Sequence, residues 1–323
     1  NVKIVKIVSD INDKYIHTPN TYYVGYGSIR TIFFKTLKAK AIIMTMTELE
    51  SSFIKKSNNN IKYFYVFHSI VSTHRVYKDK AFDNYDYILC VGDHHINEIE
   101  RREKLYNLPK KKLFKHGYGK LDTLEEQLSK KINSNETNKN ILIAPTWGDS
   151  SILKSCIINL TKILLENSFS VKIRLHTMSM RYDKKIIKEL KENFSKDLNF
   201  SFDDEMNSLE SFYQSATMIS EWSGAAIEFA FSKCRPVIFI NTKPKVNNEN
   251  WDNINSPCLE DTIRKKIGVV IDEKDISSIP KVISTLNIKN TEWKKQIQIV
   301  KNETIFNLNK SGEYGAKIIL DNI

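Results

Sequence analysis

Short apolar runs alternate with amphipathic stretches along most of this chain, and this alternation constrains its fold more than any other feature. In the first half, buried strands are indicated by the length and the aromatic and β-branched content of Ala41–Met46, Lys62–Phe67 and Tyr87–Val91. Ile29–Leu37 and His94–Tyr106 have the apolar spacing of helices. Strands and helices that alternate in this way form a parallel sheet covered by helices. The sequence therefore predicts an α/β fold.

The same rhythm restarts after a polar interval. Leu128–Lys139 contains Asn, Ser, Lys and Thr with few apolar residues, which is the composition of a linker. After it we expect strands at 141–144, 170–175, 200–202, 217–220, 236–240 and 269–271, and helices at 152–167, 184–194, 208–215, 224–231, 276–286, 293–305 and 312–320. The second half therefore repeats the organisation of the first.

The length of 323 residues exceeds what one hydrophobic core usually holds, so we expect two domains. Residues 1–132 would form an acceptor-side domain, and residues 138–323 a nucleotide-donor domain with closing C-terminal helices. Two Rossmann-like domains joined by one linker form a GT-B-like architecture. Since open parallel sheets bind ligands at the carboxyl ends of their strands, we expect the site in a central cleft between the domains.

The composition indicates a cytoplasmic protein. Hydrophobic residues make up 41% of the chain, and no apolar run reaches the roughly 18 residues that span a membrane. No signal peptide is visible. The four cysteines form no CxxC pair, so we expect reduced thiols and no zinc site. The chain begins at Asn1 without Met and enters the apolar Val2–Val8 segment at once, which is typical of a fragment that lacks a first strand, helix or membrane anchor.

The net charge of +11 has two interpretations. In one, the basic residues form a face that binds anionic lipid, an anionic polymer or nucleotide phosphates. In the other, the charge reflects a general abundance of Lys, together with Asn and Ile, along the whole chain. Lys110–Lys112 with Lys115 is the clearest cationic cluster, and it suits either the inner face of the cell membrane or a solvated loop. No RNA- or DNA-binding signature accompanies the charge, so we expect no nucleic-acid partner.

The strongest motif is Thr217–Ala230, in which an apolar strand ends in a polar turn that opens directly into a helix. Glu221 lies in the turn, and Ser223, Gly224 and Ala225 are small, so a ligand can reach the backbone N–H groups. A helix N-terminus offers unpaired donors and the positive end of a dipole, which suits a diphosphate. The alternative is an ordinary strand-to-helix turn with a serine cap.

Two other expected strands of the second half end in polar residues. Arg174 and His176 follow one strand, two positions apart, so both would point to the same side. Thr146 and Trp147 follow another, before Gly148. Each pair alone could be an exposed strand end or a plain turn. Because three strands of one sheet deliver polar loops at their carboxyl ends, we expect a ligand there.

In the first half, His68 follows an apolar strand and suits deprotonation of a hydroxyl near neutral pH. The segment Ser72–Arg75 comes shortly after it, and Gly117 with Tyr118 begins a second loop on the same side. His94–His95 lies at a helix start and is interpreted as surface. The chain has no HxxxH or DxD motif and no carboxylate cluster with metal spacing, so we expect neither a metal nor another cofactor.

In this order and spacing, the motifs resemble the CDP-glycerol glycerophosphotransferase family, which makes teichoic acids and related capsule polymers. That family carries Trp-His-Gly, Gly-Tyr-Pro-Arg-Asn-Asp, Ala-Pro-Thr-Trp, Arg-Pro-His-Pro and Asp-Tyr-Ser-Ser. The similarity covers roughly residues 60–245, and the counterparts here are Phe67–Ser69, Gly117–Asp122, Ala144–Trp147, Arg174–His176 and Glu221–Gly224. Ser69 replaces the glycine after the first histidine, Gly224 replaces the second serine, and no proline follows His176.

The resemblance implies a role for each matched position. His68 would be the general base, and Arg174 with His176 would stabilise diphosphate charge. Ser223 and the helix that it heads would hold the phosphates, and Ala144–Trp147 would contribute to the nucleotide pocket. The expected activity is transfer of glycerol phosphate, or a related polyol phosphate, from a CDP-activated donor to a hydroxyl of a lipid-linked or glycan acceptor.

Two other function classes fit the same sequence. A GT-B glycosyltransferase with a CMP- or UDP-sugar donor would need the same phosphate-binding turn, and the Gly224 departure favours it. A non-catalytic subunit of a capsule assembly complex would bind nucleotide without turnover, or bind none. A sugar-nucleotide epimerase is disfavoured because the expected carboxylates are not apparent. The sequence specifies neither the acceptor nor the oligomeric state.

Overall fold

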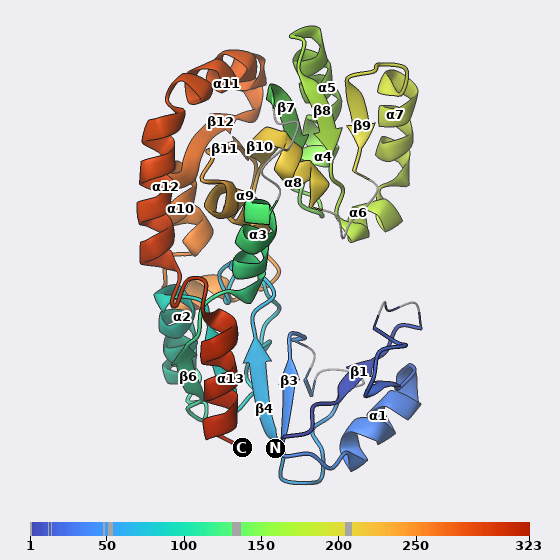
Figure 1. Ribbon diagram of the computed structural model, residues 1–323, viewed down its shortest axis with the longest axis vertical. Coiled ribbons are helices and arrows are strands. Elements are labelled where there is room, and N and C mark those ends of the chain that lie inside the picture. The colour runs from blue at the N-terminus through green and yellow to red at the C-terminus, as the bar shows by residue number, and fades with distance from the viewer. Residues whose placement is uncertain are drawn as a thin grey trace.

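The computed structural model describes residues 2–323 except positions 12, 14, 48, 51–53, 131–136 and 204–208. Two parallel sheets, drawn one above the other in Figure 1, organise the chain. The four-stranded sheet has the order β3 (Ala41–Met44), β4 (Lys62–Val66), β5 (Tyr87–Cys90) and β6 (Lys112–Lys115). The six-stranded sheet has the order β12 (Gly268–Asp272), β11 (Val237–Asn241), β10 (Ser215–Ser220), β7 (Thr137–Ile143), β8 (Ser170–Ile173) and β9 (Phe200–Phe202). The predicted parallel α/β fold is confirmed.

Helices cover both sheets, and the chain returns to the first sheet at its end. Around the smaller sheet these are α2 (Asp93–Leu105), α3 (Gly119–Lys130) and α13 (Ser311–Asp321). Ile318 and Ile319 of α13 pack against Phe64 and Leu89 in the strands of that sheet, and Figure 1 shows α13 alongside β4. The last helix therefore covers residues that precede it by more than two hundred positions.

The larger sheet carries most of the helices. They are α4 (Ile152–Ser155), α5 (Ile157–Glu166), α6 (Thr177–Tyr182), α7 (Lys184–Phe194), α8 (Glu210–Gln214), α9 (Gly224–Lys233), α10 (Leu259–Ile267), α11 (Ile279–Ile288) and α12 (Asn290–Thr304). The single helix expected at 152–167 is wrong, because Cys156 leaves helical geometry with φ −137° and divides it into α4 and α5. Helices α6 and α10 were not predicted.

The N-terminal apolar segment lies outside both large sheets. There β1 (Lys6–Val8) pairs in parallel with β2 (Thr21–Tyr23), and α1 (Gly27–Thr36) follows. Of the described helices, none is long and apolar enough to cross a membrane. Cys90, Cys156, Cys234 and Cys258 are free thiols, as expected.

The expected linker is largely regular structure where it is described. Helix α3 extends to Lys130, and β7 begins at Thr137. Residues 131–136, where the two expected domains would divide, lie outside the described residues. The domain boundaries at 132 and 138 therefore stay a prediction.

Buried polar contacts join the two halves of the chain. The hydroxyl of Ser72, beyond β4, donates to the carboxylate of Glu260 in α10 and accepts a hydrogen bond of 2.8 Å from the Leu259 N–H. The Tyr118 hydroxyl, just before α3, donates to Glu228 of α9 over 2.5 Å. These bonds link loops beyond the carboxyl ends of the smaller sheet to helices of the larger one.

Candidate active site

His68 lies beyond the carboxyl end of β4 and is exposed. Its Nδ1 lies 2.9 Å from the carbonyl oxygen of Thr45. Because a carbonyl can only accept, Nδ1 carries the hydrogen, and Nε2 is the basic nitrogen of the neutral ring. An imidazole held in this tautomer can accept a proton from a hydroxyl group.

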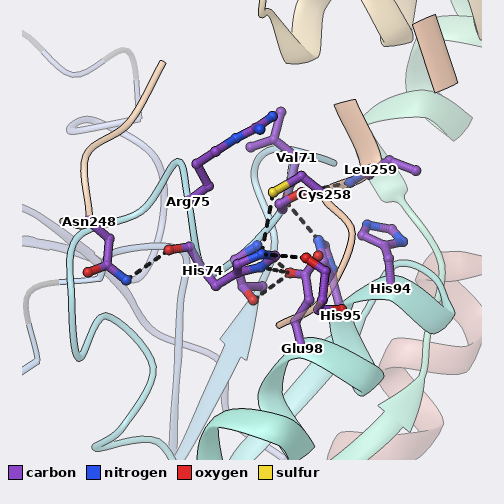
Figure 2. Close-up of polar contacts among 12 residues, drawn as sticks. Val71, His74, Arg75, His94, His95, Glu98, Asn248, Cys258 and Leu259 are labelled. Atoms are coloured by element: carbon purple, nitrogen blue, oxygen red, sulfur yellow. Dashed lines mark hydrogen bonds and ion pairs between the residues drawn. The ribbon is translucent and has the colours of Figure 1, made fainter. Parts of the chain in front are cut away.

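Two further histidines support the loop that carries His68 (Figure 2). His94 Nε2 donates to the Ile70 carbonyl over 2.9 Å, and His95 Nε2 donates to the Val71 carbonyl over 3.0 Å. His95 is fully buried, and burial lowers the pKa of both rings, so they are neutral donors. The surface interpretation of this pair is wrong, because both side chains face inward and bond the loop.

The Ser72–Arg75 segment is also engaged within the protein. Thr73 donates to Glu98 Oε2 from its N–H over 2.5 Å and from its hydroxyl over 2.6 Å. His74 Nδ1 lies 3.3 Å from the same oxygen, and Figure 2 shows His74 beside Glu98 of α2. Arg75 forms a salt bridge of 2.8 Å with Asp261. The segment fixes the His68 loop to α2 and α10.

The turn at Ser223–Gly224 meets this loop from the other half. Ser223 is the N-cap of α9, and its hydroxyl accepts a hydrogen bond of 3.2 Å from the Ala225 N–H. A Cβ on Gly224 would lie 2.6 Å from the Ser69 Oγ and 3.3 Å from Val71. A side chain at 224 would require Ser69 to move, because the neighbour of His68 lies directly against the start of α9.

Glu221 joins two strand-end loops of the larger sheet. Its Oε1 accepts from the Thr146 N–H over 2.9 Å, the Thr146 hydroxyl over 3.1 Å and the Ile152 N–H over 3.3 Å. Burial raises the pKa of Glu221 to about 7. Within the described part of the chain, Glu221 Oε2 has no hydrogen-bond partner. Both Glu221 and Thr146 are buried and hold these loops together, and their expected part in donor binding stays a prediction.

Trp147 and His176 lie together, with ring centroids 5.9 Å apart. His176 is the N-cap of α6, and its Nδ1 accepts a hydrogen bond of 3.1 Å from the Met178 N–H. Nε2 therefore carries the hydrogen in the neutral ring. Burial and the charge of Lys245 lower the pKa of His176 to about 4. His176 is thus an uncharged N–H donor at neutral pH.

Lys245 is the residue of this group that the sequence analysis missed. It follows β11, and its Nζ lies 4.2 Å from the centroid of the Trp147 ring. No motif surrounds it, and the only signal in the sequence is its place shortly after the expected strand at 236–240. The carboxyl ends of β7, β8 and β11 thus bring an indole, an imidazole and an ammonium group together.

Arg174 lies apart from that group. Its Nε is 2.5 Å from Asp203 Oδ2, and its guanidinium lies over the Phe212 ring. Strand β8 ends at Ile173, so the alternation that would put Arg174 and His176 on one side does not extend to them. The structure pairs Arg174 with a carboxylate, and its role toward a diphosphate stays a prediction.

Gly117 and Tyr118 contact protein groups. Gly117 has φ +110°, and a Cβ there would lie 2.5 Å from the carbonyl oxygen of Phe306. The Tyr118 hydroxyl, which donates to Glu228, also lies 3.0 Å from the carbonyl oxygen of His68. Their expected part in donor binding stays a prediction, while the structure places Tyr118 as a support of the His68 loop.

No metal-binding cluster is present among the described residues, since no three His, Cys, Asp or Glu side chains are placed to hold an ion. The strand-end loops bring histidines, a helix N-terminus and Lys245 to this part of the molecule. This set can remove a proton from a hydroxyl group and stabilise phosphate charge.

Comparison with known proteins gives both a fold and a family. The wall teichoic acid polymerase TagF has a similar fold, with 14% identity over 82% of this chain and 69% of that chain and a TM-score of 0.52. A TagF variant soaked with CDPG has 16% identity over 88% of this chain and 72% of that chain, with a TM-score of 0.55. UDP-GlcNAc 2-epimerase from Methanocaldococcus jannaschii has 12% identity over 94% of this chain and 84% of that chain, with a TM-score of 0.54. These similarities confirm the GT-B-like fold.

No curated protein sequence matches the chain. A family model, however, matches residues 1–245, which is most of its length. That span includes both histidine loops and the turn before α9. The chain therefore belongs to the CDP-Glycerol:Poly(glycerophosphate) glycerophosphotransferase family.

Proposed function

We propose that this protein transfers glycerol phosphate from CDP-glycerol to a hydroxyl group of a lipid-linked or glycan acceptor during synthesis of a cell-surface polymer. The observation that carries the proposal is the contact of Ser69 with Gly224, which brings the His68 loop to the N-terminus of α9. A base and a phosphate-binding helix end from different halves are then adjacent. Membership of the glycerophosphotransferase family supports the choice of donor.

In the proposed reaction, Nε2 of His68 takes the proton of the acceptor hydroxyl. The acceptor oxygen attacks the phosphorus of the glycerol phosphate group, and the bond from that phosphorus to the bridging oxygen breaks. CMP leaves with that oxygen, and the proton on His68 passes to solvent. Positioning and charge stabilisation carry most of the catalysis in phosphoryl transfers of this kind.

Negative charge that develops on the phosphates needs nearby donors. The first turn of α9 supplies backbone N–H groups and the positive end of the helix dipole. His176 supplies an uncharged Nε2–H, which donates a hydrogen bond without adding charge. Trp147 beside it offers an aromatic surface for the base of the nucleotide.

We also propose peripheral association with the cytoplasmic face of the cell membrane, because the acceptor is proposed to be lipid-linked. Three of the four lysines of the expected cationic cluster support it, since Lys110, Lys112 and Lys115 are exposed. Lys111 does not contribute, because it is nearly buried and its Nζ lies 3.5 Å from a Glu103 carboxylate oxygen. Co-sedimentation with vesicles that is insensitive to salt and to anionic lipid would contradict an electrostatic association through these lysines.

A donor panel tests the proposed activity. The purified protein would be incubated with CDP-glycerol or with CMP- and UDP-sugars and an acceptor, and CMP release and acceptor extension would be measured. We expect both products only from CDP-glycerol. Turnover of a nucleotide sugar would instead identify a glycosyltransferase, and nucleotide binding without turnover would identify a non-catalytic subunit.

A further inference from the structure

Lys245 lies where the strand ends of the larger sheet converge. It is half-buried, and its ammonium group stands over the face of Trp147 at 4.2 Å. Trp147 follows β7 and packs beside His176, which follows β8. Ligands of open parallel sheets bind at this edge, so Lys245 occupies the expected donor side of the site.

No carboxylate of a described residue bonds to the ammonium group of Lys245. Among the described residues, no salt bridge to Lys245 is formed, in contrast to Arg174, whose guanidinium is bonded to Asp203. Glu221 is the carboxyl group whose charge acts on Lys245, and burial of the ammonium lowers its pKa to about 8 despite that attraction. A half-buried cation without a bonded anion costs free energy, which an arriving anion would offset.

The chemistry around Lys245 suits a diphosphate. An ammonium group offers three donors on a flexible stem and binds phosphate as a point charge. The Nε2–H of His176 adds an uncharged donor in the same group of side chains. The ammonium group over the Trp147 ring lies between the loops that follow β7 and β11.

We propose that Lys245, rather than Arg174, is the cation that binds the diphosphate of the nucleotide donor. This assignment rests on the proposed function and adds the residue that recognises the phosphates. Lys245 also becomes a determinant of preference for a diphosphate donor over a nucleoside or a nucleoside monophosphate.

Isothermal titration of three ligands tests it: CDP, CMP and cytidine, each against the wild type and Lys245→Met. Because hydrogen bonds to charged groups are the strong ones, we expect CDP affinity to fall about 10- to 100-fold in the variant, with cytidine affinity unchanged. Lys243→Met is the matched control, since Lys243 is an exposed lysine of the same loop, and it should bind all three ligands as the wild type does.

The outcomes separate the assignment from the proposed function. If Lys245→Met binds CDP as tightly as the wild type, or loses cytidine binding to the same extent as CDP binding, Lys245 is not the diphosphate cation. If the wild type binds none of the cytidine ligands, the proposed function itself fails. Should thermal unfolding show that Lys245→Met is not folded, Lys245→Gln serves for the same titrations, and Lys245→Arg should restore CDP binding.

Discussion

His68 and His176 each follow a parallel strand, β4 in one sheet and β8 in the other, but their Nδ1 atoms make opposite hydrogen bonds. Nδ1 of His68 donates to the Thr45 carbonyl, whereas Nδ1 of His176 accepts from the Met178 N–H. The neutral rings are thus opposite tautomers, with a basic Nε2 in His68 and an Nε2–H donor in His176. One backbone group thus decides which Nε2 can accept a proton and which can donate one, and the proposed roles of the two imidazoles depend on that difference.

The surroundings of the two histidines differ as well. The His68 loop is bonded by buried side chains, including His95 and the Glu98 carboxylate that accepts from Thr73. His176 is positioned by its own helix cap and packs beside Trp147. His68 therefore lies in the region with more buried hydrogen bonds, and His176 lies among aromatic and cationic side chains.

The largest expected effect comes from removing the base. His68→Ala should lower kcat by about 10²- to 10⁴-fold, the usual contribution of general base catalysis, with CDP affinity unchanged. The measurement is CMP release at saturating CDP-glycerol. His17→Ala, a change at another exposed histidine, should keep the wild-type rate. A wild-type rate in the His68 variant would show that the tautomer contrast has no catalytic meaning.

Next in size is the support of the His68 loop. Glu98→Ala leaves the N–H and hydroxyl of Thr73 without their buried acceptor, so the free energy of unfolding should fall by about 3 kcal/mol. Urea unfolding measures this change. Glu100→Ala removes an exposed carboxylate from the same helix and should change stability by less than about 0.5 kcal/mol. Equal losses in the two variants would contradict the claimed difference in buried hydrogen bonding between the histidine regions.

A smaller effect is expected at the contact between the halves. The family pattern has glycine at the position of Ser69 and serine at the position of Gly224. The small residue and the serine are therefore interchanged between the two loops in this chain. A side chain at 224 meets the Ser69 Oγ at 2.6 Å. Gly224→Ser should therefore displace the His68 loop and lower kcat/KM about tenfold, and Ser69→Gly added to it should restore most of the loss.

A control variant and two possible outcomes test whether Ser69 and Gly224 compensate for each other. Gly312→Ser introduces a side chain where no atom lies within 4 Å of the new Cβ, and it should leave kcat/KM unchanged. If Gly224→Ser behaves as this control does, the approach of Ser69 is not required for activity. If the double variant is no better than Gly224→Ser, the two positions are not coupled.

A separate effect is expected on the pH dependence of stability. The pKa of His176 is lowered to about 4 in the folded chain, against about 6.5 for an unperturbed histidine. Between these values the unfolded chain binds more protons, so His176 lowers stability as the pH falls from 7 to 4. His176→Gln should weaken that decline in urea-unfolding midpoints. If the unfolding midpoint of His176→Gln falls with pH as steeply as that of the wild type, the His176 ring is not held neutral in the folded chain.

Local patterns predicted the regular elements well. The expected bounds of α7 and β9 match the structure, because their apolar residues follow one period from end to end. The division of 152–167 at Cys156 was missed, since the apolar pattern continues across it. Helix α10, Leu259–Ile267, was also missed; its carboxylates bond Ser72 and Arg75 from the other half.

The candidate site was predictable only in part. Strand ends and small residues located His68, Trp147 and His176 without an alignment. The tautomers and Lys245 were not predictable, because they depend on contacts such as that of Lys245 with Trp147, almost a hundred residues apart in the chain. The inward bonds of His95 and the pairing of Arg174 with Asp203 depend in the same way on tertiary contacts.

The Tyr118 hydroxyl, between Glu228 of α9 and the His68 carbonyl, has a consequence for the rate of reaction. This buried side chain helps to fix the separation of the His68 loop and helix α9 as the chain folds. The translational and rotational freedom of these two groups is then lost before any substrate arrives. Reactants bound between them would meet at an effective concentration that can reach roughly 10⁵ M in well-oriented systems.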